Sequence, residues 1–131
     1  MQIKLARHFF VVFLAALLTA CSGSGPEKVA EKYASSIINA DIDTFLATVY
    51  LSEEEKSQIN MMSGKLEEMF KMAQIQAQAA GGIKSIKASD TEYSADKMNA
   101  MVTLRISFKN GTSEEDRVRL INTSSGWKVQ P

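Results

Sequence analysis

Residues 98–112 read MNAMVTLRISFKNGT, and this stretch decides the fold. From Met98 to Phe108, apolar and polar residues alternate, which is the pattern of a β-strand with one buried face and one wet face. The apolar positions are Met98, Ala100, Val102, Leu104, Ile106 and Phe108. The Asn110-Gly111 pair that follows is typical of a tight hairpin turn. The stretch therefore predicts a central antiparallel strand whose neighbour begins directly after the turn.

Two hairpin loops fit this turn, and they differ in register. A two-residue loop would put Val118 of the next strand on the face opposite Leu104. A three-residue loop over residues 109–111, with Gly111 in the left-handed region, pairs Val102 with Val118 and keeps the apolar residues on one face. Because register follows burial, we predict the three-residue loop.

Three further strands are expected around this hairpin. Residues 83–93 form a weaker strand, and residues 118–121 lie in the strand after the turn. Trp127 and Val129 lie in a fourth strand, and we expect Trp127 to pack this strand onto the core. The connections are short, which favours an antiparallel meander.

Before Gly81-Gly82 the chain has helical periodicity instead. Pro26 and Glu27 suit the first turn of a helix. The N–H that proline lacks would have no partner there, and the negative charge of Glu27 lies at the positive end of the helix dipole. Asp43 is the expected N-cap of a short second helix over residues 44–50.

Ser52, followed three residues later by Glu55, has the capping-box pattern that predicts the start of a third helix. Its apolar positions keep helical spacing through Ala80. The predicted core stripe is Ile59, Met62, Leu66, Met69, Phe70, Ala73 and Ala77. Gly64 is either a break between two helices or a weak point that costs about 1 kcal/mol relative to alanine.

Helices followed by a four-stranded meander make an α+β fold. One sheet face carries an apolar stripe, and the helices are the available cover for it. We therefore expect N-terminal helices packed on a curved antiparallel sheet, with residues 26–131 forming a single domain.

The first 20 residues predict a secretory signal, because a charged start precedes an apolar run over residues 9–18 and a small-residue exit. The sequence Leu-Thr-Ala-Cys at 18–21 resembles the lipobox of bacterial lipoproteins. That resemblance implies cleavage before Cys21 and a diacylglyceryl group, with its acyl (palmitate-type) chains, on the cysteine sulfur. We expect residues 21–25 to be a lipidated cysteine and a short flexible tether.

Ser22 follows the cysteine, and in the enterobacterial sorting pattern that this resembles, serine favours export to the outer membrane. We therefore expect a periplasm-facing outer-membrane lipoprotein, attached to the membrane by acyl chains. Removal of the signal leaves 13 basic residues against 15 acidic ones. This near-neutral balance gives no electrostatic reason to expect a nucleic-acid partner.

The whole pattern resembles small bacterial lipoproteins that carry a domain of unknown function of the nuclear transport factor 2-like (cystatin-like) superfamily. The motifs that carry the resemblance are Pro-Glu-Lys-Val-Ala at 26–30, the Asp-rich joint at 41–44, Gly81-Gly82, Asn110-Gly111 and Gly-Trp-Lys-Val at 126–129. The resemblance implies a sheet wrapped around helices into a cone. It implies no activity, because that superfamily includes enzymes, carriers and scaffolds.

Several chemistries are excluded after the signal is removed. The single histidine, His8, lies in the signal, and lipidation would consume the single cysteine. A cysteine nucleophile, a histidine base, a catalytic triad and ordinary zinc ligation are then ruled out. We predict no catalytic residue, no cofactor and no metal site. Tyr33, Tyr50 and Asp43 are the groups that an isomerase-like or dehydratase-like alternative would use.

Two acidic runs are interpreted as solvated charge. Residues 53–55 face a helix dipole, and residues 114–116 lack the ligand spacing of a calcium loop. The basic residues that share the wet sheet face with the second run are expected to form exposed ion pairs with it. These basic residues are Arg105, Arg117 and Arg119.

Methionine is the compositional oddity. Met61, Met72 and Ile75 fall off the predicted core stripe of the third helix, and Met101 falls on the wet side of its strand. Flexible thioethers suit adaptable apolar contact surfaces. We therefore expect a non-enzymatic binding or assembly-accessory domain, with Met61, Met72 and Ile75 as a surface for a small apolar ligand or another envelope protein. A small enzyme and a purely structural envelope spacer remain the alternatives.

Overall fold

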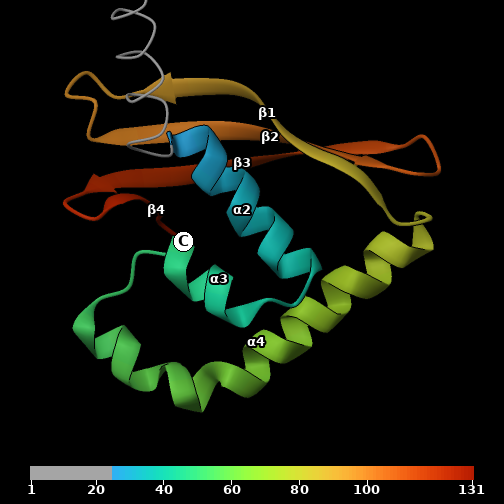
Figure 1. Ribbon diagram of the computed structural model, residues 1–131, viewed down its shortest axis with the longest axis horizontal. Helices are drawn as coiled ribbons and strands as arrows, with labels where there is room; N and C mark the ends of the chain where they lie inside the picture. The colour runs from blue at the N-terminus through green and yellow to red at the C-terminus, as the bar shows by residue number, and fades with distance from the viewer. Residues whose placement is uncertain (1–24) are drawn as a thin grey trace, which may run out of the picture.

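The computed structural model describes residues 25–131. The predicted signal, Cys21 and all of the predicted tether except Gly25 lie outside the described residues. Three helices come first: α2 (Pro26–Ile38), α3 (Ile42–Thr48) and α4 (Glu53–Ala79). Four strands follow: β1 (Ile83–Tyr93), β2 (Asn99–Phe108), β3 (Ser113–Thr123) and β4 (Gly126–Val129). They form one antiparallel sheet in the order β1-β2-β3-β4, so the predicted α+β meander is confirmed (Figure 1).

The β2–β3 hairpin has the predicted three-residue loop. Val102 pairs with Val118, so the apolar residues of both strands share one face. The Phe108 amide donates to the carbonyl of Thr112 at 2.9 Å, and the Gly111 amide donates back to the Phe108 carbonyl at 3.1 Å. Gly111 has φ 91°, a left-handed conformation that glycine adopts without strain. The register therefore follows the burial of the apolar residues, as predicted.

The core lies between α2 and the sheet. Small or branched side chains on α2 let it lie close to β2 and β3, and α2 contacts all four strands. The buried cluster consists of Val29, Ala30, Ala34, Val49, Val102, Leu104, Val118, Leu120 and Val129. Trp127 packs against this cluster from β4, as predicted. Glu31 of α2 also fixes β1, because its carboxylate accepts a hydrogen bond from the Ala88 amide at 2.9 Å, beside a register shift in that strand.

The cap of α3 differs from the prediction. Asp41, not Asp43, is the N-cap, and its carboxylate accepts from the Thr44 hydroxyl at 2.6 Å and the Thr44 amide at 3.2 Å. Both hydrogen bonds lower the pKa of Asp41, and the bond from the Thr44 hydroxyl has the larger effect. The helix begins two residues before the predicted start because Ala40 turns the chain with φ 53°. It ends early because Val49 leaves it to form a parallel bridge with Val129 of β4.

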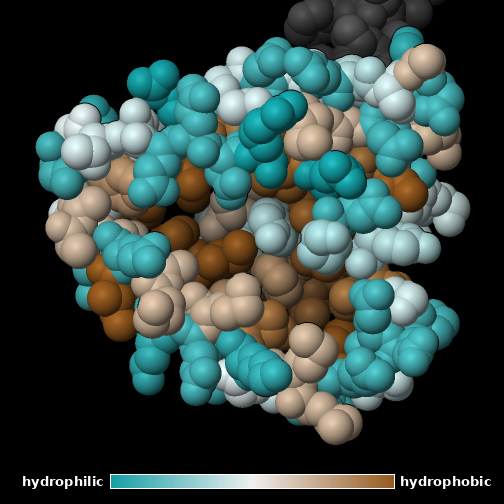
Figure 2. All heavy atoms as spheres, turned by 180° about the vertical axis from the view of Figure 1, so that it is seen from behind, coloured by the Kyte–Doolittle hydropathy of each residue, from teal (hydrophilic) through white to brown (hydrophobic). Residues whose placement is uncertain are grey.

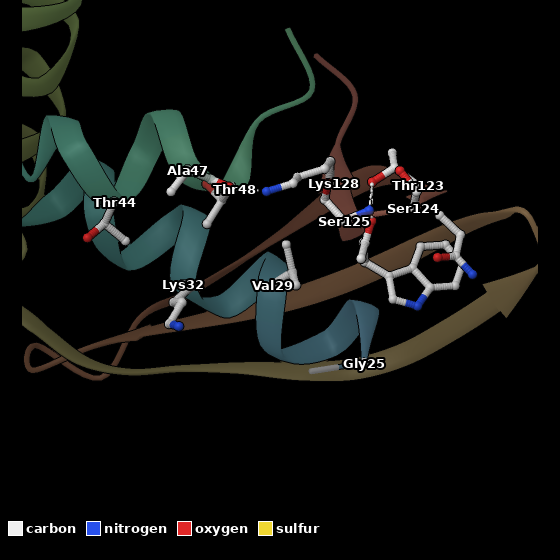
Figure 3. A pocket seen from close by; sticks show the side chains of 13 residues that line it. Gly25, Val29, Lys32, Thr44, Ala47, Thr48, Thr123, Ser124, Ser125 and Lys128 are labelled. Atoms are coloured by element: carbon white, nitrogen blue, oxygen red, sulfur yellow. Dashed lines mark hydrogen bonds between the residues drawn. The ribbon is translucent and has the colours of Figure 1, made fainter. Parts of the chain in front are cut away.

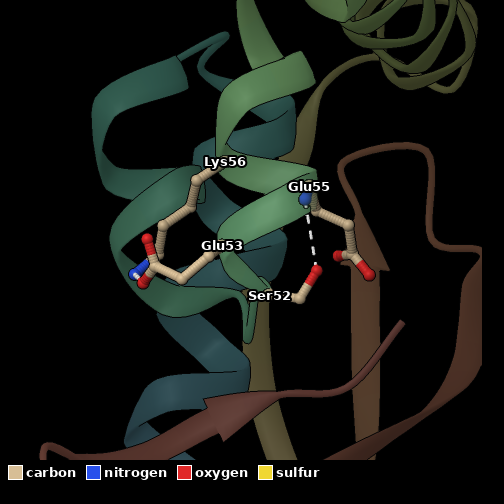
Figure 4. A network of polar contacts seen from close by, with 4 residues as sticks. All are labelled: Ser52, Glu53, Glu55 and Lys56. Carbon is tan, nitrogen blue, oxygen red and sulfur yellow. Dashed lines mark hydrogen bonds and ion pairs between the residues drawn. The ribbon is translucent and has the colours of Figure 1, made fainter.

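The start of α4 is confirmed. The Ser52 hydroxyl accepts from the Glu55 amide at 3.1 Å, and Lys56 pairs with Glu53 at 3.3 Å (Figure 4). The helix continues through Gly64 without a break. Figure 1 shows it bent in its first half, after which the ribbon runs straight toward β1. Gly64 is therefore a weak point within one helix rather than a boundary between two.

The predicted core stripe of α4 is wrong in part. Phe70 and Ala77 are the buried residues of the helix, whereas Met62 and Met69 are 48% and 63% exposed. The reason is the position of α4, which packs mainly on α2 and not on the sheet. Phe70 reaches inward to the ring of Phe45 on α3, with ring centroids 5.1 Å apart. Only Phe70 and Ala77 of α4 are therefore buried, whereas the prediction was that one whole side of the helix would be.

Two predictions about the sheet faces also need correction. Met98 precedes β2 and is 47% exposed, so the apolar set begins at Ala100. Register places Glu114 opposite Ile106 and Asp116 opposite Leu104, on the core-side face. Of the predicted pairs only Arg105 and Glu115 lie directly opposite each other. In residues 25–131 the one ion pair within 4.0 Å is Lys56–Glu53, so the expected pairs do not form.

Two glycine substitutions should act in opposite directions. Gly64 has open space around its Cβ position in a helix, so Gly64→Ala should raise the free energy of unfolding by about 1 kcal/mol. Gly111→Ala also meets no neighbour, but its positive φ should cost about 1 kcal/mol. Urea denaturation of the two variants checks both values. A stabilising Gly111→Ala would contradict the three-residue loop.

Candidate functional site

The outer side of α4 carries three exposed apolar side chains. Met61, Met72 and Ile75 are 86%, 59% and 58% exposed, and we call these three residues the methionine face. Helical geometry places them on roughly the opposite side of α4 from buried Phe70. The sequence identified these three residues because they fall off the core stripe. The structure leaves them open to solvent.

The methionine face lies outside every cleft described below, so it is an exposed helix surface and not part of these clefts. Seen from behind, apolar atoms also gather in a hollow near the middle of the molecule, with polar atoms around its rim (Figure 2). Small ligands bind in concave sites that bury most of their surface. An exposed helix face instead fits a flat or grooved protein surface.

A cleft with a volume of about 910 Å³ lies between α2, α3 and the β3–β4 turn (Figure 3). Lys32 and Lys128 line it together with several hydroxyl groups, and no carboxylate is among the described residues that line it. The Lys128 ammonium donates to the carbonyl of Ala47 at 2.6 Å, which joins β4 to the end of α3. Sequence reasoning missed this cleft, because Lys32 and Lys128 are separated by most of the domain.

A smaller cleft brings Tyr33 close to Asp116. Burial raises the pKa of Tyr33, and the negative charge of Asp116 raises it further, so the phenol stays protonated at neutral pH. The ring of Tyr33 stacks on Phe45 with centroids 5.5 Å apart. Tyr33 therefore packs against the core on one side and faces the carboxylate of Asp116 on the other.

The structure does not assemble the groups of the enzyme alternative. Tyr50 is 46% exposed and lines a different cleft from Tyr33, beside Lys56. Asp43 lies exposed on α3 and lines neither of these two clefts. Within residues 25–131 no cluster of three or more His, Cys, Asp or Glu side chains could hold a metal ion. No helix in the same range is long and apolar enough to span a bilayer.

Comparison with known families and structures shows which proteins this chain is similar to. The family model described as a domain of unknown function (DUF4878) matches residues 19–130, and the chain belongs to this family. A search of the curated proteins found no match. These findings confirm the expected domain of unknown function and leave the predicted lipidation a prediction.

Among solved structures, the chain is similar to a Campylobacter jejuni protein described as an NTF2-like transpeptidase. The two share 22% identity with a TM-score of 0.69, and the match covers 82% of this chain and 99% of the other. At this identity the likeness shows the NTF2-like fold alone. The intermembrane space region of the chloroplast protein ARC6 aligns at 15% identity, over 80% of this chain and 92% of the other, with a TM-score of only 0.30.

The two sides of α4 should respond differently to mutation. Replacing Met61, Met72 and Ile75 together by serine should leave the urea midpoint almost unchanged, because these side chains already face water. Phe70→Ala should lower the free energy of unfolding by about 3–5 kcal/mol, because Phe70 is 1% exposed. Equal destabilisation by the two changes would mean that the methionine face is part of the core.

Proposed function

We propose that this chain is a lipid-anchored, periplasm-facing, non-enzymatic binding domain that docks another protein of the cell envelope through the methionine face. The observation that carries the proposal is the exposure of Met61, Met72 and Ile75 on one side of a helix whose other side is packed. Met72 and Ile75 lie about one turn apart, and Met61 lies on the same side about three turns before Met72. Exposed apolar side chains that share one side of a helix are typical of interaction surfaces. Methionine suits such a surface, because its flexible thioether adapts to a partner.

The lipobox-like sequence at 18–21 supports the anchor. The first described helix begins at Pro26, five residues after Cys21, so the fold would sit close to the bilayer. Several acyl chains on one cysteine hold a protein stably in a membrane, since each buried methylene contributes about 0.8 kcal/mol. Ser22 supports export to the outer membrane.

A protein partner explains the methionine face better than a small apolar ligand or the bilayer. The face lines none of the clefts, and a small ligand needs a cavity to bury most of its surface. The helix carries five glutamates and three lysines, so an anionic lipid surface would not attract it.

The rival reading, an isomerase-like or dehydratase-like enzyme, has less support. It needs a carboxylate or a tyrosine of strongly shifted pKa inside a closed apolar cavity. Burial raises the pKa of Tyr33, but its cleft is also lined by the charged residues Asp116, Arg117 and Arg119. Hydrogen bonds lower the pKa of two described carboxyl groups instead: the Thr44 hydroxyl and amide donate to Asp41, and the Ser94 hydroxyl and the Met98 amide donate to Asp96. A purely structural spacer is also less favoured, because it gives no reason for exposed methionines.

The anchor can be tested by metabolic labelling. Cells grown with radioactive palmitate should label the wild-type chain, and the label should disappear in Cys21→Ala, because that sulfur is the acyl acceptor. Ser22→Ala is the matched control and should keep the label. An unlabelled wild type, or a Cys21→Ala variant that still fractionates with membranes, would contradict the anchor.

The docking face can be tested by site-specific photo-crosslinking in intact cells. A photoreactive residue at Met72 should form defined protein adducts, because the partner covers this position. The same residue at Lys87, which is exposed on β1, should not form them. Adducts with lipid alone, or equal adducts from both positions, would contradict protein docking by α4.

A further inference from the structure

We propose that the partner of the methionine face is a second copy of this chain, with the two α4 helices packed antiparallel about a twofold axis. The inference rests on the proposed docking function and names its partner. The observation behind it is an exposed seam along α4 whose residue spacing and charges are complementary to those of a second copy.

The seam follows the spacing by which packed helices meet. Starting at Met61, alternating steps of four and three residues lead along one side of α4, which is the repeat of helix pairs that pack side by side. The seam consists of Met61, Lys65, Glu68, Met72, Ile75 and Ala79. Every one of these side chains is exposed, so this side of the helix has no cover within the described chain.

Charge selects the direction and the register of the pairing. In a parallel pair Lys65 would face Lys65 and Glu68 would face Glu68, which is repulsive. In an antiparallel pair centred between residues 66 and 67, Lys65 of each copy faces Glu68 of the other. The same register places Met61 opposite Met72. A shift by one heptad in either direction keeps the seam but loses both ion pairs.

Both charges are available for this contact. Lys65 and Glu68 are exposed, and neither belongs to the one ion pair found in residues 25–131. The part of α4 after its bend runs straight toward β1 (Figure 1). In the antiparallel register the two helices lie along each other around residues 62–71, with Met61 and Met72 at the two ends of the contact.

Such an interface is short, so it would be weak between molecules free in solution. Anchoring both copies to one membrane confines them to the same layer and raises their effective concentration. A twofold contact also doubles every interaction, since each residue pair occurs twice. The predicted pair thus has four methionines and two ion pairs.

The experiment uses cysteine crosslinking of the full chain in its native membrane. Two differently tagged copies are co-expressed, one with Met61→Cys and one with Met72→Cys, and a mild oxidant is added. We expect disulfide-linked pairs between the two different copies. Two Met61→Cys copies should crosslink poorly, because the two sites would lie about 16 Å apart along antiparallel helices.

Charge reversal then separates specific pairing from random collision. Lys65→Glu or Glu68→Lys alone creates like charges at both contacts and should reduce crosslinking about tenfold. The double reversal, Lys65→Glu with Glu68→Lys, recreates both ion pairs and should restore it. Lys56→Glu lies outside the seam and serves as the control that should leave crosslinking unchanged.

The outcomes distinguish this inference from the proposed function. Crosslinking that is equal for all cysteine pairs, or that the double reversal fails to restore, overturns the antiparallel pair. If the photoreactive residue at Met72 captures only a different protein, self-pairing is overturned and the docking function stands. If that residue captures no protein, both are overturned.

Discussion

The apolar face of β2 must be covered, and the rest of the structure depends on how this is done. Val102 and Leu104 are fully buried in the contact between this strand and α2. The three-residue loop with Gly111 brings Val118 onto the same face, so both β2 and β3 contribute apolar side chains to the core. Burial of these side chains removes apolar surface from water, which is the main driving force for this arrangement.

Because α2 covers the sheet, α4 makes few contacts with it. This helix packs on α2, reaches the core through Phe70 and returns to the sheet through Gly81-Gly82. At this return the amides of Asn110 and Lys109 donate to the carbonyls of Ala80 and Gly82. The helix is therefore fixed at its end and along one line, while its outer side stays free. Because only one line of α4 is packed, its outer side is available as a surface for a partner.

Local chemistry explains what the sequence could predict. The alternation in β2, the Asn110-Gly111 turn and the Ser52 cap each depend on neighbouring residues, so their signals are present in short segments. The exposure of Met62 and Met69 could not be predicted, because it depends on which element covers α4. The Lys32–Lys128 cleft was missed for the same reason. The shift of the α3 cap to Asp41 depends on a turn at Ala40 that carries no glycine signal.

The proposed docking requires that the outer side of α4 is free in the isolated chain and covered in the cell. Methionine oxidation by dilute peroxide, read by mass spectrometry, tests it most directly. In dilute detergent-purified protein, Met61, Met72 and Met98 should all oxidise, because all three are exposed. In intact cells Met61 and Met72 should be protected at least severalfold, while Met98, outside α4, should oxidise as before. Equal oxidation of Met61 and Met72 in both settings would contradict the account.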